Sequence, residues 1–194
     1  MRRLFLPTLL VYFLTLPPAA FGNPLRSRGS ASVIVGGQTI DTHDGSRTEA
    51  GLDLAIQGVR WPVAVALFAS RSAMTVPSAT EGGDFHYKFD QLGLGIRRDW
   101  SRGLFQPYTS AGAEWGEERV KEDYDDNGMP FGFSSHGLGW WAAGGGLFRA
   151  SSRLRVGAGV RYSALNQDFG RYSTTYKVWS IHARLGWSWP ALDD

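Results

Sequence analysis

The chain has 194 residues, and its 20 lysines and arginines nearly balance its 18 aspartates and glutamates. This length suits one domain, and the small net charge leaves no bulk positive field for nucleic acid. The sequence contains no cysteine, which excludes a disulfide framework, a thiolate metal site and a lipidated amino-terminal cysteine.

The first 22 residues differ from everything that follows. Arg2 and Arg3 precede an apolar run, Leu4 to Leu16, which is followed by two prolines and several small residues. The run has roughly 13 residues, whereas an anchoring helix needs about 20, so it predicts a cleaved signal peptide over residues 1–22. We expect residues 23–194 to form one exported domain with a formal charge of zero, because cleavage removes two arginines and no acid.

Beyond this segment no stretch approaches about 18 uncharged apolar residues, which excludes a helical membrane protein. The 25 glycines and the spaced prolines instead favour many strands joined by turns. Alternation of apolar and other residues is clearest at four places: residues 52–57, 92–97, 154–162 and 179–189. Weaker strands are predicted at residues 31–40, 63–72, 104–118 and 137–148.

The connections between these eight strands are expected to alternate in length. Short connections are predicted around residues 60–62, 99–103 and 149–153, and long ones around residues 41–50, 73–85, 119–136 and 167–175. Short turns on one rim and longer loops on the other are typical of outer-membrane barrels. The pattern predicts an all-β fold, an eight-stranded antiparallel up-and-down transmembrane barrel with both chain ends on the tight-turn side.

The non-apolar face of the predicted strands carries charges of both signs. Its members are Asp53, Gln57, Arg97, Glu114, Arg155, Arg161, His182 and Arg184, interspersed with Gly93, Gly95, Gly112, Gly157, Gly159 and Gly186. In a soluble lipocalin-like barrel this face would be the solvated exterior, an alternative that stays open. Glycine weakens exposed strands, whereas inside a narrow barrel it makes room for arginine and glutamate. We therefore expect an internal salt-bridge network that joins Arg97, Arg155, Arg161 and Arg184 to Glu114, Glu118 and Asp53.

Tryptophans are placed as in a membrane protein, although ordinary core positions would also accommodate them. Trp61, Trp100, Trp187 and Trp189 lie at or near the predicted tight turns, while Trp115, Trp140, Trp141 and Trp179 fall farther along the strands. Aromatic rings favour the membrane interface, where an apolar body and a polar N–H are both satisfied.

The last strand carries the most specific pattern, since Leu185, Trp187 and Trp189 alternate along Lys177 to Trp189. This strand resembles the carboxy-terminal insertion signal of small eight-stranded outer-membrane barrels: the OmpA transmembrane domain, OmpX and opacity-type surface proteins. Members often end on the final aromatic residue, whereas this chain continues to Asp194. The resemblance implies a Gram-negative outer-membrane location, periplasmic termini and contact of the last strand with the barrel-insertion machinery.

Two local motifs invite a chemical interpretation. The run Asp123 to Gly128 fits the first six positions of an EF-hand loop, but the twelfth position is Ser134 and no flanking helices are predicted, so an acidic loop is favoured. Ser180 and His182 share one strand face, as a hydrolase nucleophile and base could, yet no nucleophile motif surrounds them. We therefore assign no catalytic, cofactor-binding or metal-binding residue.

Charge is distributed unevenly along the predicted barrel. Arginines gather near the tight turns, at Arg60, Arg98, Arg102, Arg149 and Arg153, and acids occupy the long loops, at Asp41, Asp44, Glu81, Asp84, Glu122, Asp123, Asp125 and Asp126. Eight strands leave an interior filled by side chains, so a porin is not expected. The sequence favours a structural or surface-interaction role through the long, acidic outside loops, with outer-membrane lipid, lipopolysaccharide and an unidentified surface partner as contacts. A lipid-modifying barrel enzyme and a soluble ligand-binding barrel are the alternatives.

Overall fold

The computed structural model describes residues 27–41, 43–58, 60–77, 84–100, 103–122, 132–168 and 173–189. The predicted signal peptide lies outside these residues, so its cleavage stays a prediction. In the described ranges, no helix is long and apolar enough to cross a membrane.

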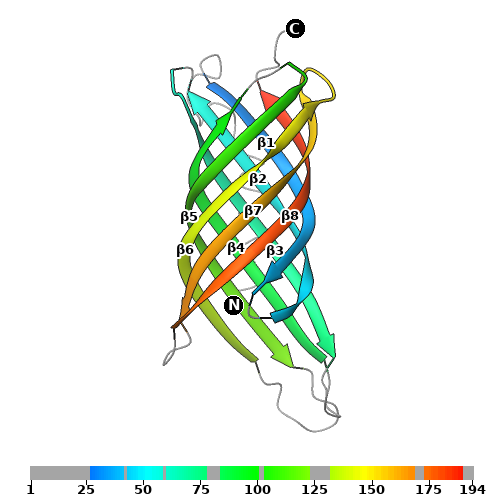
Figure 1. The fold of residues 1–194 in the computed structure, drawn as a ribbon, viewed down its shortest axis with the longest axis vertical. Coiled ribbons are helices and arrows are strands. Elements are labelled where there is room, and N and C mark those ends of the chain that lie inside the picture. The colour runs from blue at the N-terminus through cyan, green and yellow to red at the C-terminus, as the bar shows by residue number, and fades with distance from the viewer. Residues whose placement is uncertain are drawn as a thin grey trace, which may run out of the picture.

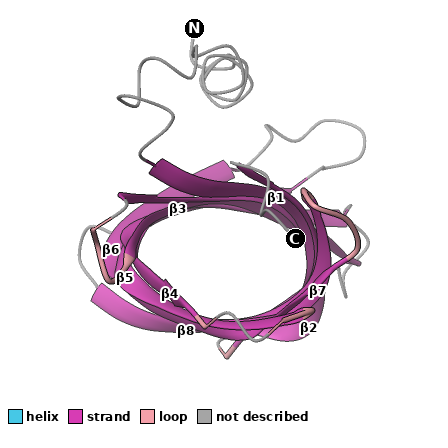
Figure 2. Cartoon of the chain, turned by 90° about the horizontal axis from the view of Figure 1, so that it is seen from above, coloured by secondary structure: helices cyan, strands magenta, loops and turns pink. Residues whose placement is uncertain are grey.

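Eight strands form one closed barrel in which every neighbouring pair is antiparallel (Figures 1 and 2). The strands are β1 (Ser27–Ile40), β2 (His43–Gly58), β3 (Ala64–Pro77), β4 (Asp84–Asp99), β5 (Phe105–Glu122), β6 (Gly132–Arg149), β7 (Leu154–Asp168) and β8 (Ser173–Trp189). Strands β1 and β8 close the ring, with Gly29 opposite Trp189 and Ile40 opposite Val178. The predicted up-and-down topology and the strand count are confirmed.

Closure removes both sheet edges, so the backbone N–H and C=O groups of the strands are satisfied by neighbours on each side. Side chains therefore alternate between the lumen and the outer surface, most regularly along β8, where buried and exposed positions alternate from Thr175 to Ser188. The period of two that the sequence shows at residues 179–189 thus continues toward Ser173.

The strands are longer than the sequence predicted, and the long connection expected at residues 41–50 is wrong. Strand β2 begins at His43, and its ladder with β1 pairs Thr48 with Gly37 and Ala50 with Val35. The other predicted long loops also shrink, because β4, β6 and β8 begin at Asp84, Gly132 and Ser173. Polar outward residues do not end a strand whose backbone is already paired on both sides.

Tight turns lie at the rim where β1 starts and β8 ends, which is the upper rim in Figure 1. Between β4 and β5, Trp100 donates its backbone N–H to Pro107 at 2.9 Å. Gly103 follows with φ of 64°, a left-handed conformation that side chains disfavour. Both described ends of the barrel, Ser27 and Trp189, are on this tight-turn rim, as the sequence predicted.

Candidate functional site: the barrel lumen and its outer surface

The lumen is mostly polar, and most of the outer surface between the two rims is apolar. All eight polar side chains that the sequence assigned to one face point inward, and Arg97, Glu114, Arg161, His182 and Arg184 are nearly inaccessible to solvent. Large apolar side chains are exposed on the outside, including Val35, Leu94, Ile96, Val160, Ile181 and Leu185. This distribution is the reverse of that in a soluble barrel, whose apolar side chains face its core.

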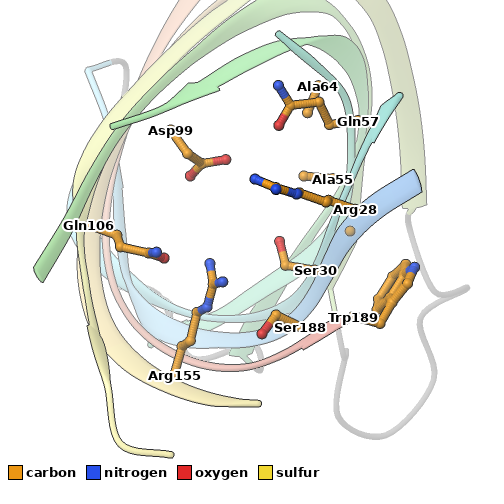
Figure 3. Close-up of a pocket in the computed structure, with 11 residues that line it drawn as sticks. Arg28, Ser30, Ala55, Gln57, Ala64, Asp99, Gln106, Arg155, Ser188 and Trp189 are labelled. Atoms are coloured by element: carbon orange, nitrogen blue, oxygen red, sulfur yellow. The ribbon is translucent and has the colours of Figure 1, made fainter. Parts of the chain in front are cut away.

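A polar cavity of about 140 Å³ opens inside the tight-turn rim. Figure 3 shows Arg28 of β1 and Arg155 of β7 reaching into it, with Asp99 and Gln106 also among the side chains that line it. The Arg155 Nε and Gln106 Oε1 atoms are buried without a hydrogen-bond partner in the described protein. Water in the cavity can satisfy these two atoms.

Deeper in the barrel than this cavity, Asp53 joins two arginines from different strands. The Asp53 carboxylate contacts Arg97 Nη1 at 3.1 Å and Arg184 Nη2 at 2.5 Å. Both guanidiniums also stack on the ring of Tyr108, with their central carbons 4.2 and 4.6 Å from its centroid. Arg97 has a second carboxylate partner, Asp99, at 2.8 Å. These side chains fill the lumen next to the cavity.

The middle of the lumen combines hydrogen bonds with an aromatic pair. Arg161 forms a buried ion pair with Glu49, and Gln91 donates to Glu114. Phe68 packs edge-on against Trp141, with centroids 5.0 Å apart, and Arg161 lies over the Phe68 ring at 4.1 Å. Charges and rings thus occupy the same cross-section.

An apolar layer closes the lumen toward the far rim. Its residues come from four strands: Ile40, Phe89, Leu165, Tyr176 and Val178. Beside this layer, Arg47 and Glu118 form an ion pair of 2.8 Å with both side chains almost fully buried. Along β4 the lumen-facing order from the tight-turn rim is Asp99, Arg97, Gln91 and Phe89, so successive side chains block the lumen at several levels.

The sequence predicted that charged side chains pair inside the barrel, but it predicted only some of the pairs. Asp53 does pair with Arg97 and Arg184, whereas Glu114 takes a hydrogen bond from Gln91 and Glu118 pairs with Arg47. The partners that sequence reasoning missed are Arg47, Glu49, Gln91 and Asp99.

Arg47 and Glu49 were missed because residues 41–50 were assigned to a loop. The signal was present, since Arg47, Glu49, Gly51 and Asp53 continue one face of β2 at a period of two.

The predicted purpose of the lumen glycines needs correction. A Cβ at Gly93 would lie 2.1 Å from Phe68 Cε1, and one at Gly159 would lie 2.1 Å from the Tyr108 hydroxyl. At Gly112 the obstacle is the backbone carbonyl of Leu94 across the ladder. These glycines therefore make room for aromatic rings and close strands, rather than for arginine and glutamate.

Of the two local motifs, the structure describes only the Ser180–His182 pair. Ser180 is buried and accepts a hydrogen bond from Gln38 Nε2 at 3.3 Å, and His182 Nδ1 has no partner within the described part of the chain. The EF-hand-like run from Asp123 to Gly128 lies outside the described residues. Among the residues that are described, no three potential metal ligands form a group.

Aromatic residues mark two levels on the outer surface. Near the tight turns, Phe105 packs against Phe148 at 4.9 Å. Farther along, Tyr162 packs between Trp140 at 5.4 Å and Trp179 at 4.8 Å. Trp141, by contrast, points into the lumen and donates to the Ala113 carbonyl at 3.1 Å.

The two levels are separated by eight residues on each of two strands, from Phe148 to Trp140 on β6 and from Trp187 to Trp179 on β8. At about 3.3 Å per residue and a tilt of about 40°, the separation along the barrel axis is about 20 Å. With the ring dimensions added, this matches the apolar band of about 25 Å that outer-membrane barrels present to lipid.

No protein-family model matches this sequence, and no curated protein matches it. Solved structures do match its fold. Neisserial surface protein A aligns with a TM-score of 0.56 and 13% identity, over 84% of this chain and 95% of that one. A major outer membrane protein from Thermus thermophilus aligns with a TM-score of 0.55 and 12% identity, over 84% of this chain and 98% of that one.

Ail, the attachment invasion locus protein of Yersinia pestis, was solved in complex with the heparin analogue sucrose octasulfate. It aligns with a TM-score of 0.52 and 14% identity, over 84% of this chain and 98% of its own. At these identities the likeness concerns the fold alone. The chain thus has the fold of small eight-stranded outer-membrane β-barrels, and the resemblance drawn from the sequence is confirmed at that level.

Proposed function

We propose that this chain is an integral protein of a bacterial outer membrane, with a structural or surface-interaction role and with its tight turns and chain ends in the periplasm. The observation that carries the proposal is the inverted distribution of polarity, with a charged, side-chain-filled lumen inside a wall of exposed apolar side chains. Soluble monomers rarely expose contiguous apolar surface of this extent, whereas the hydrocarbon core requires it.

The same distribution argues against a soluble ligand-binding barrel. Leu94 and Ile96 on β4, and Ile181 on β8, each expose more than half of their surface on the outside. Burying one such side chain is worth about 1.5 to 3 kcal/mol, so leaving all of them in water would forfeit a large part of the stabilisation. A lipid environment removes this cost.

A diffusion pore is not favoured, because side chains block the described lumen at several levels. The Arg97–Asp53–Arg184 group, the Phe68–Trp141 pair and the apolar layer follow one another along the axis. Eight-stranded barrels are generally filled in this manner.

An enzyme acting on lipid is not favoured either. Ser180 and His182 are buried inside the lumen, whereas a lipid substrate would reach the barrel at its outer surface.

A contact role is favoured at the end of the barrel distal to the tight turns, where the strands continue past the second aromatic level. The name of Ail, attachment invasion locus protein, agrees with a contact role for this fold.

Location is tested by fractionating Gram-negative cells that express the full chain. We expect recovery in the outer-membrane fraction and a migration on unboiled gels that differs from that of the boiled protein. Recovery as a soluble periplasmic monomer would overturn the proposal.

Orientation is tested by introducing single cysteines, which is straightforward because the sequence has none. Ser173→Cys lies at the far end of β8, and Ser152→Cys lies in the tight turn between β6 and β7; both positions are exposed. A bulky maleimide that does not pass the outer membrane should label the first variant on intact cells and the second only after permeabilisation. The opposite pattern would place the chain ends outside.

A further inference from the structure

Charged residues form a cluster on the outer surface of β3, β4 and β5. Nearer the tight turns, the same outer face of these strands is apolar and would contact the hydrocarbon. We define this β3–β5 cluster as Arg71, Lys88, Asp90, Glu117 and Arg119. Arg71 holds Asp90 through Nε at 2.6 Å and Nη2 at 2.9 Å. Arg119 holds Glu117 through the same two nitrogens, each at 2.8 Å, and its Nη2 lies 4.0 Å from Asp90.

The cluster lies at the edge of the apolar band that is distal to the tight turns. On β4 the outward residues that precede it from the tight-turn side are Ile96, Leu94 and Leu92, all exposed. On β5, Glu117 occupies the next outward position after Trp115. Trp115 pairs with Leu138, which itself follows Trp140 of the second aromatic level. The cluster therefore begins where the aromatic level ends, at the depth of lipid headgroups.

The barrel surface is asymmetric at this depth. The aromatic triplet Trp140, Tyr162 and Trp179 covers β6, β7 and β8, whereas β3, β4 and β5 carry the charges. Three cations against two carboxylates leave the cluster net positive. The side chains of Arg71 and Arg119 are 48% and 46% exposed, so both guanidiniums remain accessible while the carboxylates hold them in fixed orientations.

A groove of about 370 Å³ runs over the outer surface on the tight-turn side of the cluster, between β4 and β6. Most of its lining residues are small or apolar, among them Thr109 and Ala111 on β5 and Ala142 on β6, and Arg98 lines it at the tight-turn end of β4. Small residues let a methylene chain approach the strands closely. Cations at headgroup depth, together with a mostly apolar groove that has Arg98 only at its tight-turn end, suit a ligand with an anionic head and acyl chains.

We propose that the β3–β5 cluster binds the phosphate of a phosphorylated glycolipid of the outer leaflet, with an acyl chain directed along the groove toward the tight turns. A guanidinium presents two parallel N–H donors that match phosphate oxygens, and such charge-assisted bonds are among the strongest in proteins. Glu117, whose side chain is 24% exposed, can accept a hydrogen bond from a hydroxyl group. The sugar of a glycolipid carries more hydroxyl groups than the headgroup of a simple phospholipid. The inference rests on the proposed membrane location and orientation.

The test uses the full chain folded in detergent micelles and native mass spectrometry of lipid adducts. The probes are diphosphorylated lipid A, lipid A without phosphates, and phosphatidylglycerol. The test variant is Arg71→Gln/Asp90→Asn/Arg119→Gln, which removes both guanidiniums without leaving the buried Asp90 carboxylate unpaired. The control is Arg60→Gln, which changes the net charge equally but lies in an exposed turn at the opposite rim.

We expect the wild type and the control to bind one diphosphorylated lipid A, and the triple variant to bind it about a hundredfold more weakly, at about tenfold per arginine. Equal binding by the triple variant and the control would overturn the inference. Equal binding of phosphate-free lipid A would exclude phosphate recognition, and equal binding of phosphatidylglycerol would exclude the glycolipid. Heat-modified migration is measured for each sample, so failure to form a membrane barrel is seen separately from failure to bind lipid.

Discussion

The Asp53 carboxylate offers the sharpest test of how the lumen is stabilised, because it lies between two buried guanidiniums. The side chains of Arg97 and Arg184 are 1% and 2% exposed, and Asp53 itself is 14% exposed. In Asp53→Asn, Arg97 keeps its contact with Asp99 at 2.8 Å. Arg184 loses the carboxylate that it contacts within the described lumen.

Removing one partner of a buried ion pair typically costs about 3 to 5 kcal/mol, because the other charge is left without compensation. We expect Asp53→Asn to lie near the lower end of this range, at about 3 kcal/mol, since the polar cavity is close enough to hydrate the site partly. Asp99→Asn should cost about 1 kcal/mol or less, because the Asp99 side chain is 29% exposed and Arg97 keeps Asp53.

The free energy of unfolding is measured by urea titration of barrels folded in micelles, followed by heat-modified migration on gels. A second-site change sharpens the test: Asp53→Asn/Arg184→Met removes the uncompensated charge and should recover most of the loss. Equal costs for Asp53→Asn and Asp99→Asn, or no recovery in the double variant, would refute the assignment of Asp53 as the shared anion.

Three further predictions concern single substitutions. Gly93→Ala should lower the free energy of unfolding by about 1 to 3 kcal/mol, because its Cβ would meet the Phe68 ring at 2.1 Å. In the same urea titration Gly144→Ala should be nearly neutral, since its nearest contact is 3.6 Å away. Gly103→Ala should cost about 1 kcal/mol for its φ of 64°, and Gly103→Asn should cost less. Ser180→Ala should leave the lipid profile of expressing cells unchanged by mass spectrometry, and a lost lipid modification would revive the enzyme hypothesis.

The fold was predictable because an up-and-down barrel repeats one simple rule. Residues 92–97 and 154–162 alternate without interruption, since each strand separates a polar lumen from an apolar exterior. Strand ends were less predictable. Beyond the apolar band the outer face becomes polar as well, so the alternation in Arg47, Thr48 and Glu49 loses its contrast although the ladder continues.

Pairing inside the lumen was not predictable for a different reason. A partner is set by which side chains meet across the barrel, and this depends on strand register and tilt, neither of which one sequence reveals. Arg161 pairs with Glu49, 112 positions away along the chain. The Phe68–Trp141 pair in the lumen was equally unpredictable. Trp140 and Trp141 are adjacent in sequence, so a register shift of one residue would exchange the outward-facing ring for the lumen-facing one.

The longer strands also change where a surface partner would bind. The sequence suggested long acidic loops as the contact surface, whereas β5 and β6 continue as a paired ladder to Lys121 and Gly132, well past Trp115 and Trp140. A paired ladder is stiffer than a loop of the same length, so side chains on it lose less conformational entropy when a partner binds. The end of the barrel distal to the tight turns is formed by paired strands, and Lys88 is exposed there. We therefore assign the proposed contact role first to this surface, rather than to loop residues alone.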